Sequence, residues 1–94
     1  MKWFVYILIC EDNSFYVGHT NNVEKRFERH LVGRGAHYTA KHAPTSIAYK
    51  EEFLTETDAV ARERQIKKWS RAKKQALIDN DMARLRMLSR SREH

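Results

Sequence analysis

Two tyrosines, Tyr6 and Tyr16, lie in two short apolar stretches that are separated by turn-forming residues. In an antiparallel pair, opposite residue numbers have a constant sum, so the phenols share a face only if that sum is even. A loop at 11–13 places Tyr6 opposite Gly18, with Tyr16 as its diagonal neighbour, whereas a four-residue loop makes the phenols diverge. A shared site therefore predicts a loop of three or five residues; the alternative is two tyrosines chosen for strand propensity.

Gly18, at the end of the second apolar stretch, and two later residues, Arg26 and His30, could together form a site for a phosphate. Gly18 leaves room for the close approach of a backbone or a ligand, or it simply ends the strand. Arg26 and His30 lie one helical turn apart and so share a helix face. Arginine offers a fixed fork of donors for phosphate oxygens, and histidine can exchange a proton near neutral pH. As an isolated pair, however, such residues are more often ordinary surface groups.

An acid falls on the apolar stripe of a later helix. By spacing, Glu63 lies between Ala59 and Ile66, on the side that should face the core. A half-buried carboxylate costs free energy unless it is paired or binds a metal. The two interpretations are therefore a metal ligand and a salt bridge to Arg26 or Lys67.

These residues need a small sheet and several helices to bring them together. Hydrophobic periodicity and turn residues predict, in order, strand 3–10, strand 14–18, helix 22–32, strand 46–53, a helix from the cap Thr55 to about 69, and helix 71–79. The stretch 33–46 should be a loop with one helical turn, and 82–88 should add another turn or two. The predicted fold is α/β of the α+β type: a three-stranded antiparallel sheet flanked by helices, in the order ββα(α)βαα.

The helix ends and buried faces can also be predicted. Asn21 is the expected N-cap of the first helix, with Glu24 at capping-box spacing, and Ser70 that of the last. The expected buried residues of these two helices are Val23, Phe27 and Leu31, and Ala72, Ala76 and Leu77.

The length and the net charge of the chain limit the class of protein. The 94 residues suffice for one domain, and the net charge of +6 favours a polyanionic partner, nucleic acid first, over a merely solubilising surface. No apolar run reaches the roughly 20 residues that cross a bilayer. The apolar start, residues 1–10, lacks a small-residue cleavage site and reads as a buried strand, which predicts a cytoplasmic protein. The single cysteine, Cys10, allows neither a disulfide framework nor a cysteine zinc site.

The ordered motifs resemble those of the GIY-YIG nuclease domain, in its small single-domain bacterial type often described as containing a URI domain. FVY (4–6) and YVG (16–18) stand where the family has its two triplets. TNNVEKRFERH supplies the family arginine, Arg26, and the histidine of one branch, His30, while ARERQIKKW supplies the glutamate, Glu63. The resemblance covers about residues 3–78, which predicts a nuclease-like domain at 1–80 and a short basic tail at 81–94.

The resemblance implies hydrolysis of DNA phosphodiesters that depends on a divalent metal, Mg²⁺ or Mn²⁺. Glu63 would be the metal ligand, Arg26 would stabilise charge in the transition state, and either Tyr6 or Tyr16 would be the base. His30 would assist proton transfer or hold the phosphate. Further expected substrate contacts are Gly18, His19, Lys41 and His42, although the last three are more often ordinary loop residues.

Two departures from the family pattern stand out. Phe4 replaces the glycine of the first triplet, and neither Gln75 nor Asn80 clearly matches the asparagine that many members carry after the glutamate. The alternative function is a basic module that binds nucleic acid with little or no hydrolysis. The inward Glu63 argues against it, since a pure binder needs only cations and aromatic rings. A partner protein or a homodimer cannot be decided from the sequence.

Overall fold

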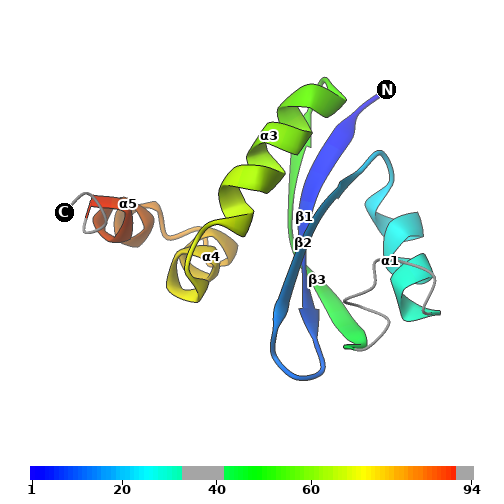
Figure 1. The fold of residues 1–94 in the computed structure, drawn as a ribbon, viewed down its shortest axis with the longest axis horizontal. Coiled ribbons are helices and arrows are strands. Elements are labelled where there is room, and N and C mark those ends of the chain that lie inside the picture. The colour runs from blue at the N-terminus through cyan, green and yellow to red at the C-terminus, as the bar shows by residue number, and fades with distance from the viewer. Residues whose placement is uncertain (33–41, 91–94) are drawn as a thin grey trace.

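The computed structural model describes residues 1–32 and 42–90 (Figure 1). The described elements, in chain order, are β1 (Trp3–Cys10), β2 (Phe15–Thr20), α1 (Val23–Leu31), β3 (Pro44–Phe53), α3 (Glu56–Lys67), α4 (Arg71–Ile78) and α5 (Met82–Arg90). The strands form one antiparallel sheet in the order β2-β1-β3, which confirms the predicted fold. The predicted helical turn in the loop before β3 falls largely on 33–41, outside the described residues.

The β1–β2 hairpin has the predicted three-residue loop. Cys10 N–H donates to Ser14 O at 2.9 Å and Asn13 N–H donates to Cys10 O at 2.8 Å. Asn13 takes a left-handed φ of 69°, a conformation that asparagine tolerates better than most residues. Tyr6 therefore pairs with Gly18 and Leu8 pairs with Tyr16, so the two tyrosines lie on one face of the sheet.

The central strand β1 is buried on both faces, as its apolar run predicts. On one face Val5, Ile7 and Val17 pack against α3 and α4, through residues that include Ala59, Ile66 and Leu77. On the other face Tyr6 and Leu8 pack against Val23 of α1. Figure 1 shows α3 and α1 on opposite sides of the sheet, with β2 between them. Side chains from both helices can therefore reach the β2 edge.

Several predicted boundaries are wrong by a few residues. β2 continues to Thr20, so Gly18 lies within the strand and does not end it. The N-cap of α1 is Asn22, whose Oδ1 accepts from Lys25 N–H at 3.0 Å, because the longer strand leaves Asn21 outside the helix entry. β3 begins at Pro44, and α3 ends at Lys67.

The inner face of α1 also differs from the prediction. Leu31 is 54% exposed, whereas His30 is buried with 1% exposed. At 3.6 residues per turn, a residue seven positions after Val23 lies about 20° from its direction, and one eight positions on lies about 80° away. The stripe that starts at Val23 therefore turns His30 toward the sheet and leaves Leu31 at the surface.

Of the two C-terminal helices, α4 packs on the sheet and α5 lies farther from it. Ser70 caps α4 through Lys73 N–H, as predicted, and Ala76 and Leu77 are buried. α5 is a regular helix that packs on α4, at the far end of the molecule from α1 (Figure 1), and none of its residues is fully buried. Within the described residues, every helix is too short or too polar to cross a membrane.

Candidate functional site

Tyr6 and Gly18 form a tight contact at the centre of the β1–β2 pair. Tyr6 is 1% exposed, and a Cβ placed on Gly18 would lie 2.5 Å from its Oη and 2.7 Å from its Cζ. The glycine thus makes room for the Tyr6 ring itself and not only for a ligand. Its role in the fold is to let this phenol lie flat across the neighbouring strand.

Changing Gly18 to alanine should therefore destabilise the protein by about 1–3 kcal/mol, because the added methyl group displaces a buried ring. Urea unfolding measures the loss. Adding Tyr6→Phe, which removes the closest atom, should restore part of the stability. A Gly18→Ala protein with unchanged stability would show that the ring does not lie against this strand.

His30 closes the tyrosine cluster from α1. Its Nε2 lies 3.1 Å from Tyr6 Oη, a hydrogen-bond distance. The rings of Tyr16 and His30 meet edge to face with centroids 5.0 Å apart, and those of Tyr6 and Tyr16 are 6.2 Å apart. Burial, together with the charges of Arg26 and Arg29, lowers the pKa of His30. The imidazole is therefore held neutral, the form that accepts a proton from a phenol.

The depressed pKa of His30 predicts a loss of stability on acidification. Its folded-state pKa lies below the ordinary 6.5, so the unfolded chain takes up the proton first as the pH falls. Stability that is present above pH 6.5 is then lost as the pH falls through the folded-state pKa. Urea midpoints of the wild type and His30→Gln, at about pH 8 and about pH 5.5, should show a smaller drop in the variant. Equal drops would mean that His30 is not protected from protonation.

Charges on α1 and α3 both act on the two phenols. Burial raises the pKa of Tyr6 and of Tyr16, the Arg26 guanidinium lowers both values, and the Glu63 carboxylate raises both. The predicted arginine and glutamate are thus brought to the same pair of tyrosines. Because the net shifts are upward, both phenols are protonated at neutral pH in the protein alone.

Glu63 is held by His19 and Lys67 at the β2 edge. Its Oε1 lies 2.5 Å from His19 Nδ1, and its Oε2 lies 2.5 Å from Lys67 Nζ. The Glu63 side chain is 14% exposed. Burial works to raise its pKa, but the hydrogen bonds from Lys67 and His19 outweigh that effect and hold the pKa below its usual range. The carboxylate is therefore ionised, and the sequence-based alternative of a Lys67 salt bridge is present.

The donor set at Glu63 fits a hard divalent cation such as Mg²⁺. Such ions are often held by one or two carboxylates, with water and substrate oxygens filling the remaining positions. In the part of the chain that the structure describes, no group of three or more histidine, cysteine or acidic side chains could hold a metal, so an ion on Glu63 would take most of its ligands from water and substrate. The Lys67 side chain is 52% exposed, which leaves its ammonium free to move aside for a metal.

Arg26 lines a small hollow where β2 leads into α1. The hollow has a volume of about 100 Å³, and its walls include Thr20, Asn22, Lys25 and Arg29. Arg26 is partly buried, whereas Lys25 and Arg29 are exposed. Three cations around one hollow form an environment suited to a phosphate.

The remaining predicted contacts lie in different places. His19 belongs to β2 and is not a loop residue; besides Glu63 it faces Glu56, whose Oε2 is 3.3 Å from its Nε2. His42 Nδ1 lies 2.7 Å from Asp12 in the hairpin loop. Lys41 lies outside the described residues.

The link between His19 and Glu63 was not predicted from the sequence. It depends on how α3 packs against β2, and no periodicity within one segment contains that information. The contact of Lys67 with Glu63 was predictable from the sequence, because Lys67 follows Glu63 by one helical turn.

Fold and site together define a small α+β domain with tyrosine, histidine, arginine and glutamate side chains gathered at the β2 edge of an antiparallel sheet. The chain belongs to the GIY-YIG family, a family of nucleases: the model of the GIY-YIG catalytic domain matches residues 2–76. This confirms the resemblance inferred from the motifs.

Proteins similar to this chain are small and consist mostly of the same domain. A UPF0213 protein of Staphylococcus haemolyticus is 44% identical over 78 residues, which cover 83% of this chain and 95% of that protein. The solution structure of a UPF0213 protein of Bacillus halodurans is 36% identical, covers 86% of each chain and has a TM-score of 0.56. A protein of E. faecalis is 31% identical, covers 85% of each chain and has a TM-score of 0.59.

Proposed function

We propose that this protein is a divalent-metal-dependent endonuclease that hydrolyses DNA phosphodiester bonds and selects its substrate by DNA structure. The observation that carries the proposal is the packed cluster of Tyr6, Tyr16 and His30 beside Gly18. Arg26 and Glu63, from helices on opposite faces of the sheet, lie close enough to shift the pKa of both phenols. A cation, an ionised carboxylate and two proton-transfer groups are what this hydrolysis requires.

Arg26 would bind the phosphate that is cleaved. Arg26 lies at the entry of α1, and its guanidinium can donate two parallel hydrogen bonds to phosphate oxygens. It keeps its charge throughout the reaction and so stabilises the extra negative charge of the transition state. Lys25 and Arg29, on the same hollow, would hold neighbouring backbone phosphates.

The two phenols and His30 form a path for the proton of the attacking water. Burial raises the pKa of Tyr16, and the charges of Lys67 and Arg26 offset only part of that rise. Tyr16 is less buried than Tyr6 and so is the better placed of the two to meet the attacking water. Tyr6 contacts both Tyr16 and His30 and can pass a proton to the neutral imidazole. The more deeply buried Tyr6 is therefore the link in this path.

Glu63 would hold the metal, Mg²⁺ or Mn²⁺, which would supply polarisation of the phosphate and of the leaving oxygen. His19 then serves as the group that orients the carboxylate through Nδ1, and not as a direct DNA contact. Lys67 would exchange its ion pair with Glu63 for contact with substrate.

Cleavage of DNA tests the proposal. Flapped, branched, nicked and linear DNA would each be incubated with the protein in Mg²⁺, in Mn²⁺ and in EDTA. We expect cleavage with metal, loss of cleavage in EDTA, and different rates among the structures. Binding of every DNA without cleavage under any condition would support instead the alternative, a non-catalytic nucleic-acid-binding module.

A further inference from the structure

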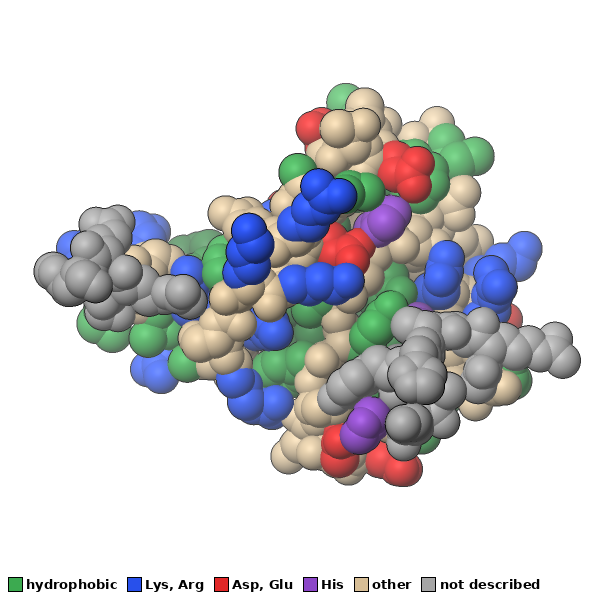
Figure 2. Space-filling model, viewed as in Figure 1, with side chains coloured by type: hydrophobic (Ala, Val, Ile, Leu, Met, Phe, Trp, Pro, Cys, Tyr) green, Lys and Arg blue, Asp and Glu red, His purple; other side chains and the backbone are tan. Residues whose placement is uncertain are grey.

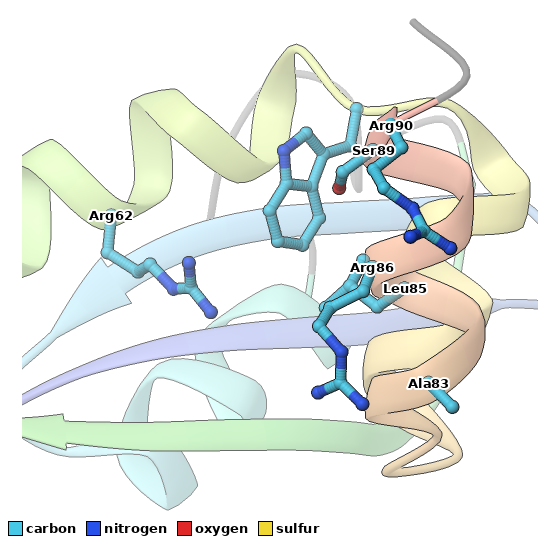
Figure 3. A pocket seen from close by; sticks show the side chains of 7 residues that line it. Arg62, Ala83, Leu85, Arg86, Ser89 and Arg90 are labelled. Atoms are coloured by element: carbon cyan, nitrogen blue, oxygen red, sulfur yellow. The ribbon is translucent and has the colours of Figure 1, made fainter.

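A hollow of about 570 Å³ lies between α3 and α5, outside the tyrosine cluster (Figure 3). Arg62 reaches into it from α3, and Arg86 and Arg90 reach it from α5. Trp69, which follows α3, forms part of the wall. The hollow is thus a basic surface with an aromatic wall, and none of its lining residues belongs to the proposed catalytic site.

This hollow and Glu63 lie on different sides of α3. Arg62 Nε donates to Glu51 of β3 at 3.1 Å, whereas Glu63 faces His19 of β2. β2 and β3 are the two edge strands of the sheet. A ligand in the hollow would therefore bind apart from the phosphate that is cleaved.

The three arginines of the hollow differ in how many contacts they already make within the protein. Arg62 is paired with Glu51, and its Cζ lies 5.2 Å from the centre of the Trp69 ring. Arg86 and Arg90 are exposed, and no ion pair of the described residues involves either of them. These two guanidinium groups are available for phosphate oxygens, which their forked donors fit well.

The basic surface continues beyond the hollow. Trp69 also lines a second hollow, of about 450 Å³, together with Arg64, Lys68 and Lys73. Lys73 Nζ lies 4.7 Å from the centre of the Trp69 ring. Figure 2 shows Lys and Arg side chains gathered over α3 and α4. Two adjoining basic hollows that share one aromatic wall fit an extended polyanion better than a single small anion.

We propose that these two hollows bind a single-stranded nucleic-acid segment, with phosphates on Arg86 and Arg90 and a base taking the place that the Arg62 guanidinium now holds over the Trp69 ring. Unpaired bases are free to stack on an aromatic side chain, whereas the bases of a duplex already stack on each other. The choice of nucleic acid as ligand rests on the proposed function. A structure-selective nuclease would bind an unpaired arm of its substrate at this site.

Fluorescence of Trp69 tests this site without reading cleavage. The chain has two tryptophans, so Trp3→Phe leaves Trp69 as the single tryptophan. In that background, with Glu63→Gln and EDTA to prevent hydrolysis, a short single-stranded oligonucleotide should quench the emission. Arg86→Gln should weaken binding by about tenfold. A duplex of the same sequence should quench less.

Arg84→Gln is the matched control, because Arg84 is also exposed on α5 but does not line the hollow. It should change the affinity by less than about twofold. Equal effects of the two substitutions, or no quenching by single strands, would overturn the proposal. Circular dichroism checks that both variants remain folded. Cleavage without quenching would reject only this site, and quenching without cleavage would reject only the nuclease proposal.

Discussion

Replacing Glu63 with glutamine should reduce metal-dependent DNA cleavage by more than about a hundredfold while DNA binding is retained. Glutamine keeps the shape of the side chain but removes the charge that would hold a divalent cation and that now attracts His19 and Lys67. Removing an acid does not weaken the attraction of a basic surface for DNA, so affinity in EDTA should stay the same or rise. Single-turnover cleavage and a binding titration in EDTA measure the two effects.

Glu56→Gln provides the control for this experiment. Glu56 is on the same helix and contacts the same histidine, at 3.3 Å, but its side chain is 54% exposed. This substitution should leave the cleavage rate close to that of the wild type. If Glu63→Gln cuts DNA at the wild-type rate, the assignment of the metal to Glu63 is wrong.

Replacing Arg26 with lysine should lower the cleavage rate by roughly 10²–10³-fold and leave DNA affinity nearly unchanged. Lysine preserves the charge that attracts the backbone, but it lacks the planar pair of donors that matches two phosphate oxygens. The loss should therefore appear in kcat and much less in KM. Arg29→Lys, on the same hollow but exposed, should have little effect on either quantity. A fully active Arg26→Lys enzyme would show that charge alone is sufficient at this position.

The hairpin register was predictable because it depends on parity. Once both strands are placed, one choice of loop length decides whether Tyr6 faces Gly18, and the structure has that pairing. The buried side of α3 was equally predictable, since Ala59 and Ile66 are fully buried at helical spacing and Glu63 lies between them. Where a periodic pattern is long, the sequence predicts the face of the element well.

Other features depended on tertiary contacts. The choice of Asn22 over Asn21 as N-cap follows from pairing of β2 with β1 as far as Thr20, a length that local turn signals did not indicate. Burial of His30 in place of Leu31 follows from where α1 begins and from the Tyr6 hydroxyl that meets the imidazole. The contact of His19 with Glu63 joins residues far apart in the chain, and only the packed structure brings them together.

The most direct test of the account is where a divalent ion binds. Mn²⁺ broadens NMR signals of nuclei close to it, and a protein of 94 residues is well suited to that measurement. We expect the signals of His19, Lys67 and Tyr16 to broaden first at low Mn²⁺, and this effect to disappear in Glu63→Gln. Broadening that spares these residues, or that persists unchanged in the variant, would contradict the claim that the β2 edge is a metal-dependent hydrolytic centre.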